Sequence, residues 1–168
     1  MSPDLLARFH AAAAASYQNG CRDAAAILPG ADLAALRAAG IPAQVLLDYA
    51  EDFSRSGTPT CEDFVAVCEI RHDVFLHRLG ARWPLAVVPE SALPLRETEL
   101  EGIPWLPRIF AKARCFLEGS LCPEVMYGCS GDRRFLADHH LTLPGFLALV
   151  RDAPDPAAVL AAVRQQKT

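Results

Sequence analysis

Cys129 is the residue whose type and position point most directly to chemistry. It immediately precedes a short predicted helix that runs through Phe135, and Arg133 and Arg134 lie in the first turns of that helix. The positive end of a helix and neighbouring guanidinium groups favour the thiolate, which is the nucleophilic form of cysteine. Cys129 is therefore a candidate catalytic nucleophile or redox thiol. The alternative is a buried loop residue packed under Tyr127, because free cysteines are among the most buried residue types.

An anion site is the second candidate, and its basic residues come from a helix predicted over residues 107–118 and from the helix after Cys129. Arg108 and Lys112 fall on one face of the first helix, together with Cys115. Basic groups on such a face bind carboxylate or phosphate, although they also form ordinary solvated surfaces. The candidate ligand-binding residues are Arg108, Lys112, Arg114, Asp132, Arg133 and Arg134.

Arg114 and Asp132 also support a structural prediction. The loop between Gly119 and Gly131 is long, and glycine at both ends makes it costly to order, so a specific contact should fix it. Asp132 lies early in its helix, where the helix dipole favours a carboxylate, and a guanidinium binds a carboxylate with two parallel bonds. We therefore predict an Arg114–Asp132 ion pair that docks the Cys129 loop onto the preceding helix.

A metal site is the third candidate. Cys61, Cys68 and His72 share one face of a helix predicted over residues 60–79, and Glu69 with His72 forms an E-x-x-H motif. That motif occurs in di-iron helix bundles, which need a second copy and two further glutamates. The sequence has no second copy, and these residues lie within the apolar stripe of the helix. Core packing is therefore the favoured interpretation, His72 is expected to be structural, and no metal ligand is predicted.

Several common catalytic signatures are missing from the sequence. It contains no P-loop, G-x-G-x-x-G, G-x-S-x-G or H-E-x-x-H motif, which argues against common ATPases, dinucleotide enzymes, serine hydrolases and zincins. His139 and His140 are interpreted as a surface turn, and no cofactor is predicted. The six cysteines include no C-x-x-C pair and are expected to be reduced thiols.

The elements that must position these residues are helices. Capping residues and apolar residues at helical spacing predict a mainly α-helical, compact, multi-helix single domain. A proline-rich irregular connection over residues 81–105 joins an N-terminal half (1–80) to a C-terminal half (106–168). At most one short strand is expected, near Leu85–Val88, because this is the only strand-like run in the sequence.

Composition limits the classes of partner. The chain has 168 residues, of which 52% are hydrophobic and 21% charged, so one domain can bury a sizeable core. Its net charge of −4 provides no basic field for nucleic acid. No apolar run reaches the ~18 residues of a membrane span, and Asp4 precedes the apolar stretch that would otherwise resemble a signal segment. We therefore expect a cytoplasmic protein with neither nucleic-acid nor membrane partners.

Residues 100–165 contain an ordered series of short motifs. They are Gly102-Ile103-Pro104-Trp105-Leu106-Pro107-Arg108, Lys112-Ala113-Arg114, Tyr127-Gly128-Cys129 and Asp132. The series resembles the bacterial family catalogued as domain of unknown function 5069, whose members typically read G-x-x-x-L-P-R, K-A-R-A, a tyrosine and N-C-P-L-D. This chain departs from the family where Gly128 replaces the asparagine and Ser130-Gly131 replaces Pro-Leu. The resemblance implies a small, largely helical cytoplasmic protein and implies no activity.

Three functional hypotheses follow from the sequence. The first is a helical module that binds an unknown protein partner or a small anionic ligand through the basic helix face and the Cys129 loop. The second is a thiol-dependent enzyme or redox protein that uses Cys129, with Arg133 or Arg134 stabilising negative charge. The third is a metal-binding helical protein. The position of the Cys129 sulfur separates the first two, since a sulfur in an open pocket beside arginines favours the enzyme and a sulfur sealed in apolar packing excludes it.

Overall fold

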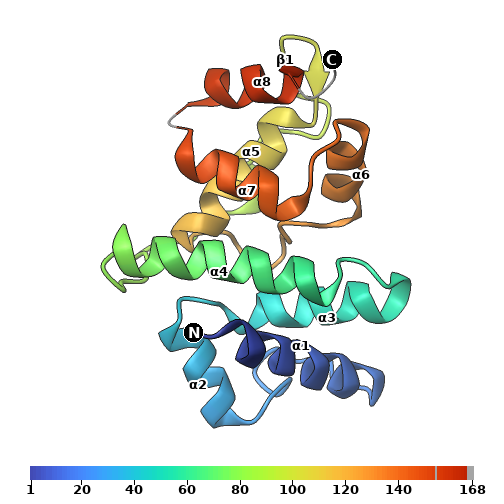
Figure 1. Cartoon of the computed structure of the whole chain (residues 1–168), viewed down its shortest axis with the longest axis vertical. Helices are drawn as coiled ribbons and strands as arrows, with labels where there is room; N and C mark the ends of the chain where they lie inside the picture. The colour runs from blue at the N-terminus through green and yellow to red at the C-terminus, as the bar shows by residue number, and fades with distance from the viewer. Residues whose placement is uncertain (154, 166–168) are drawn as a thin grey trace. The chain divides into compact units, whose positions relative to one another are not determined.

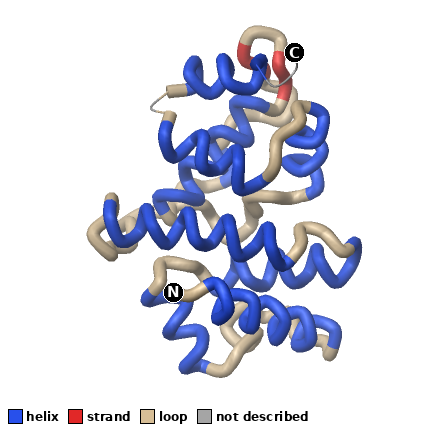
Figure 2. Tube along the Cα trace, in the orientation of Figure 1, coloured by secondary structure: helices blue, strands red, loops and turns tan. Residues whose placement is uncertain are grey.

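The computed structural model describes residues 1–153 and 155–165, and it is mainly α-helical, as the sequence predicts. Helices make up 62% of the structure, and the sheet found in the described residues has two short antiparallel strands (Figures 1 and 2). The elements are α1 (Pro3–Gln18), α2 (Gly30–Ala38), α3 (Ala43–Ser56), α4 (Cys61–His77), the 3₁₀ turn η1 (Glu90–Ala92), β1 (Glu99–Leu100), β2 (Ile103–Pro104), α5 (Leu106–Glu118), α6 (Ser130–Asp138), α7 (Leu143–Asp152) and α8 (Pro156–Gln165).

Two compact units make up the chain, Met1–Trp83 and Pro84–Thr168, which we call unit 1 and unit 2. The division falls inside the predicted 81–105 connection, and the single-domain organisation remains a prediction. In unit 1, α1 packs against α3 and α4, and α2 packs against α3 (Figure 1). The residues at its centre are fully buried, and they include Leu6, Leu36, Leu46, Tyr49, Phe64 and Val67.

The start of α4 shows how local sequence fixes an element of unit 1. The Thr60 hydroxyl accepts a hydrogen bond from the Asp63 N–H at 3.2 Å, and the Asp63 carboxylate accepts one from the Thr60 N–H at 3.0 Å. This reciprocal capping box satisfies two N–H groups that have no partner within the helix. It confirms the helix start predicted at Thr60.

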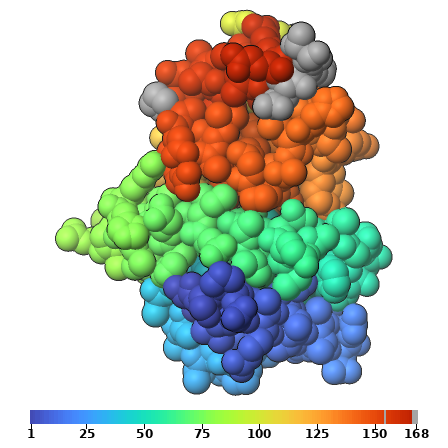
Figure 3. All heavy atoms as spheres, in the orientation of Figure 1, coloured from blue at the N-terminus to red at the C-terminus, as the bar shows by residue number. Residues whose placement is uncertain are grey.

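Helix α5 is the central element of unit 2. It packs against α7, α8 and β1, while α6 packs against α7. In the space-filling view the atoms of α7 and α8 form much of the visible face of unit 2 (Figure 3). The helix ends at Gly119, whose left-handed backbone (φ 78°) forms the cap expected of glycine. The buried apolar residues include Leu106, Ile109, Ala113, Phe146, Leu147, Val159 and Val163.

The β structure of unit 2 lies later in the chain than the sequence suggests. Strands β1 and β2 form a hairpin in which Glu99 pairs with Pro104 and Leu100 with Ile103. The predicted strand at residues 85–88 contributes only a single parallel bridge, between Val88 and Leu121. Prolines flank that run on both sides, and Leu85 is fully exposed. An apolar run without a neighbouring strand cannot extend a ladder of hydrogen bonds.

Two left-handed glycines in unit 1 provide a matched test of its packing. Gly40 (φ 80°) and Gly57 (φ 73°) have similar left-handed backbones, so an alanine would be similarly strained at either position. A Cβ at Gly40 would lie 2.2 Å from the Phe75 ring, whereas one at Gly57 would meet no atom within 4 Å. We expect Gly57→Ala to lower the free energy of unfolding by about 1 kcal/mol. Gly40→Ala should lower it by about 2 kcal/mol more, because the Phe75 ring must move within a packed core. Urea denaturation followed by circular dichroism measures both, and equal losses would contradict the packing described.

Candidate functional site

The buried carboxylate of Asp132 is the centre of the candidate site. Asp132 lies in the first turn of α6 and is 0% exposed. Its Oδ1 accepts a hydrogen bond from the Trp105 indole Nε1–H at 3.0 Å. Its Oδ2 accepts one from the Lys112 ammonium at 2.5 Å and one from the Gly128 backbone N–H at 2.9 Å. One side chain therefore joins the start of α5, the middle of α5 and the loop that precedes α6.

Trp105 reaches Asp132 from a strained backbone position. Its φ is 69°, in the left-handed region, which is an outlier for a bulky residue. The indole edge lies against Gly131, where a Cβ would be 2.5 Å from the ring. Such strain costs about 1–3 kcal/mol and persists only where the surroundings impose it. Here the indole hydrogen bond and the contact with Gly131 fix the conformation, so the start of α5 is built around the Asp132 carboxylate.

Lys112 brings a buried positive charge to the sulfur of Cys129. The side chains of Lys112 and Asp132 are only 3% and 0% exposed, and they form an ion pair. The same ammonium donates toward the Cys129 Sγ at 3.3 Å. Cys129 is half-buried and occupies the cap position of α6, where its side chain makes no capping hydrogen bond. Cys129 is thus partly buried, and the cation found beside its sulfur is Lys112, where the sequence had suggested Arg133 or Arg134.

Tyr127 closes the inner side of this loop. Its hydroxyl donates a hydrogen bond to the Leu143 carbonyl at 2.8 Å, which ties the loop to the start of α7. Burial raises the pKa of the Tyr127 phenol well above its usual value, and the negative charge of Asp132 raises that pKa further. Tyr127 therefore stays a neutral hydrogen-bond donor and acts as a structural anchor.

The predicted ion pair between Arg114 and Asp132 is wrong, although Asp132 does fix the loop as expected. Arg114 is about half exposed and pairs with Glu118 at 3.4 Å on the outer surface of α5. Residues two positions apart in a helix point about 200° apart. Lys112 therefore points inward to Asp132, while Arg114, two residues later, points to solvent.

The other basic candidates fall into two groups. Arg108 and Arg133 are tied to the protein itself: Arg108 donates to the Pro94 carbonyl at 2.8 Å and pairs with Glu90 at 2.7 Å, and Arg133 donates to the Gly128 carbonyl at 2.6 Å. Arg134 instead is exposed and lines a cleft. Because Arg108 and Lys112 are both buried, the α5 face that carries them is not a solvated basic surface.

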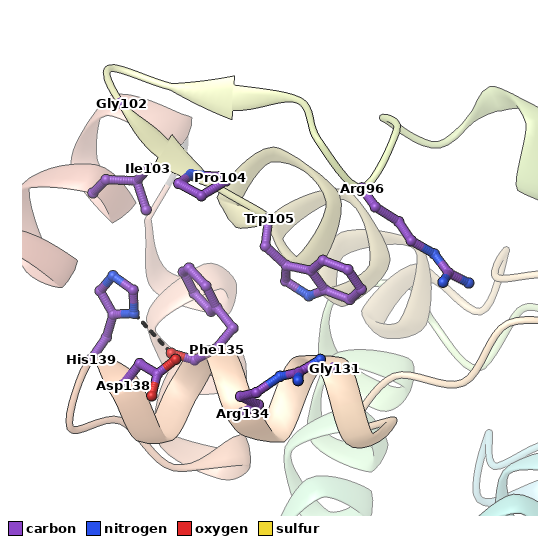
Figure 4. Close-up of a pocket in the computed structure, with 10 residues that line it drawn as sticks. All are labelled: Arg96, Gly102, Ile103, Pro104, Trp105, Gly131, Arg134, Phe135, Asp138 and His139. Atoms are coloured by element: carbon purple, nitrogen blue, oxygen red, sulfur yellow. Dashed lines mark hydrogen bonds between the residues drawn. The ribbon is translucent and has the colours of Figure 1, made fainter.

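The cleft lies between the hairpin segment and α6 and measures about 400 Å³ (Figure 4). At one end Figure 4 shows His139, whose Nδ1–H donates to the Phe135 carbonyl at 2.8 Å, with its ring packed on the Phe135 ring. His139 is buried, whereas the expected surface turn holds for the exposed His140 alone. The lining residues are Arg96, Gly102, Ile103, Pro104, Trp105, Gly131, Arg134, Phe135, Asp138 and His139.

Sequence reasoning named Cys129, Lys112 and Asp132 of the first site but, of the residues that line the cleft, only Arg134. Trp105 was part of a recognised motif, yet its role depends on a left-handed backbone that no local pattern predicts. Arg96 and His139 line the same cleft because segments more than 40 residues apart pack together, which the sequence does not reveal. A tryptophan directly before the Leu-Pro start of a helix was the one local signal available.

The residues of the third hypothesis lie in unit 1. All six cysteines are free. Cys68 is fully buried, and burial raises the pKa of its thiol. The His72 Nδ1–H donates to the Ala39 carbonyl at 2.9 Å, which is a structural contact. Within residues 1–153 and 155–165, no three His, Cys, Asp or Glu side chains gather as they would around a metal ion. Over the same residues, no helix has the length and apolar character needed to cross a membrane.

Comparisons with protein families, with curated proteins and with solved structures found no match to this chain. The resemblance to family 5069 remains a prediction.

The Lys112–Asp132 ion pair can be tested by a double-mutant cycle. Lys112→Met and Asp132→Asn should each lower the free energy of unfolding by about 3–5 kcal/mol, because each leaves a buried partner without its counter-charge. The double variant should lose clearly less than the sum of the two. Denaturation in urea measures all three proteins. Arg114→Met is the matched surface control and should cost about 0–1 kcal/mol; small, additive effects at Lys112 and Asp132 would contradict the pairing.

Proposed function

We propose that this protein carries out thiol-dependent chemistry, with Cys129 as the reacting nucleophile. The observation that carries the proposal is the 3.3 Å contact between the Lys112 Nζ and the Cys129 Sγ. It is supported by the position of Cys129 at the N-terminal cap of α6, where the helix dipole is positive. Cys129 is also only partly buried as a residue.

Lys112 supplies the electrostatic part of this chemistry. An ammonium group attracts negative charge on a neighbouring sulfur, and burial strengthens that attraction because the surroundings screen it less than water does. Asp132 holds the ammonium in place. Its Oδ2 accepts hydrogen bonds from both the Lys112 ammonium and the Gly128 N–H, so the same carboxylate positions the cation and the loop that carries Cys129. A buried ion pair contributes little net stability compared with apolar residues of the same size. Placing the Lys112 ammonium beside Cys129 is a functional reason for burying this pair.

The basic α5 face is a poorer candidate for the binding of an anion or of a protein partner. Arg108 and Lys112 direct their hydrogen bonds to groups of unit 2, as described above. An incoming anion would have to displace Glu90 and Asp132. The thiol hypothesis needs no such rearrangement, and a reduced thiol suits the cytoplasmic location that we propose for the protein.

The residues behind the family resemblance support a common origin for this site. Lys112, Cys129 and Asp132 match positions of the motifs that resemble family 5069, and in the structure Lys112 contacts both of the others; Trp105, which stands at a variable position of the G-x-x-x-L-P-R motif, contacts Asp132. We propose that residues 100–165 are related to that family and that its shared motifs encode this cluster.

Pulse labelling with iodoacetamide, followed by mass spectrometry of each cysteine, tests the proposal. Cys129 should be alkylated faster than Cys61 and Cys115, which are also half-buried and whose thiol pKa values are raised, chiefly by burial. The Lys112→Met/Asp132→Asn double variant removes the ammonium without leaving an unpaired buried charge. We expect it to slow the alkylation of Cys129 about tenfold and to leave that of Cys61 unchanged.

Cys122, which is buried in unit 2 together with the variant positions, serves as the control for folding, because it should remain unlabelled in both proteins. The proposal is wrong if Cys129 reacts no faster than Cys61 and Cys115. It is equally wrong if Cys129 of the double variant, with Cys122 still protected, is alkylated at the original rate.

A further inference from the structure

We propose that the cleft between the hairpin segment and α6 binds a small ligand that has one anionic group and a planar, apolar body. The cleft is distinct from the Cys129 sulfur, which does not line it. Its volume of about 400 Å³ lies within the range of small-molecule sites. Its lining is divided between basic, apolar and hydrogen-bond-accepting side chains.

The basic end of the cleft is formed by Arg96 and Arg134. Figure 4 shows them on either side of the Trp105 indole. Both are exposed, and within residues 1–153 and 155–165 neither forms a hydrogen bond or an ion pair. This distinguishes them from Arg108 and Arg133, whose guanidinium groups are bound within unit 2. A guanidinium binds phosphate or carboxylate with two parallel hydrogen bonds, so this end suits the anionic group.

The middle of the cleft is apolar and preformed. Ile103, Pro104 and Phe135 line it beside the Trp105 indole. The indole cannot turn freely, because its Nε1–H is bonded to Asp132 and its edge lies against Gly131. Rigid aromatic surfaces favour a planar ring by stacking or edge contact, and a preformed surface lowers the entropic cost of binding.

The far end of the cleft selects against a second negative charge. The His139 Nδ1–H is already bonded to the Phe135 carbonyl, so only Nε2 of that ring remains to meet a ligand. The neighbouring Asp138 is exposed and carries a carboxylate. Figure 4 shows both residues away from the two arginines. A ligand that spans the cleft therefore has its anionic group at the arginines and a neutral or hydrogen-bond-donating group at the His139 end.

Titration of the ¹⁵N-labelled protein with phenyl phosphate tests the proposal by NMR. Saturable shifts are expected for the Trp105 indole N–H and the Gly131 amide. Inorganic phosphate, which lacks the ring, should bind at least about tenfold more weakly, and Arg134→Gln should weaken phenyl phosphate by a similar factor. Arg114→Gln makes the same charge change outside the cleft and should leave binding unchanged. Benzoate tests a carboxylate in place of the phosphate, and terephthalate, with a second carboxylate near Asp138, should bind more weakly than benzoate.

Three results would overturn the proposal. One is the lack of saturable shifts with either phenyl phosphate or benzoate up to ~10 mM, a concentration that already corresponds to very weak binding. The second is equal affinity for inorganic phosphate and phenyl phosphate. The third is an Arg134→Gln protein that binds as well as the Arg114→Gln control. Alkylation of Cys129 is a separate measurement, so failure here leaves the proposed thiol chemistry standing.

Discussion

Unit 2 depends on the need to satisfy one buried carboxylate. Asp132 is removed from water, and a buried charge without partners is so unfavourable that the surrounding chain must supply donors. Three donors converge on it from separate parts of the sequence: an indole, an ammonium and a backbone N–H. They come from the start of α5, the middle of α5 and the Cys129 loop, so the carboxylate ties these segments to the first turn of α6, which carries it.

The same carboxylate links the two candidate sites. Its Oδ1 holds the Trp105 indole, which lines the cleft, and its Oδ2 holds Lys112, which contacts Cys129. The strained backbone of Trp105 and the glycine at position 131 are the local consequences of this arrangement. Side chains held by packing and by several hydrogen bonds keep their geometry, and a functional site requires that of its supporting residues.

The sequence predicted the helices better than it predicted the contacts between them. The capping box at Thr60 and the glycine end of α5 follow from local chemistry, and both are present. Local chemistry also indicated that Asp132 would anchor its loop. It could not identify the partner, because the choice between Lys112 and Arg114 depends on which side of α5 faces the loop. Either basic residue could pair with the carboxylate by charge. Which face of α5 is buried decides between them.

The most direct test of this account is the hydrogen-exchange rate of the Gly128 amide in the native protein. Gly128 lies in a loop, outside any helix or strand, and the hydrogen bond from its N–H goes to the Asp132 carboxylate. If Asp132 orders the loop as described, this amide should be protected to the level of the amides in the core of α5 and exchange only when unit 2 opens. Exchange at the rate of an unprotected peptide amide would show that the carboxylate does not hold the loop, and it would contradict the account.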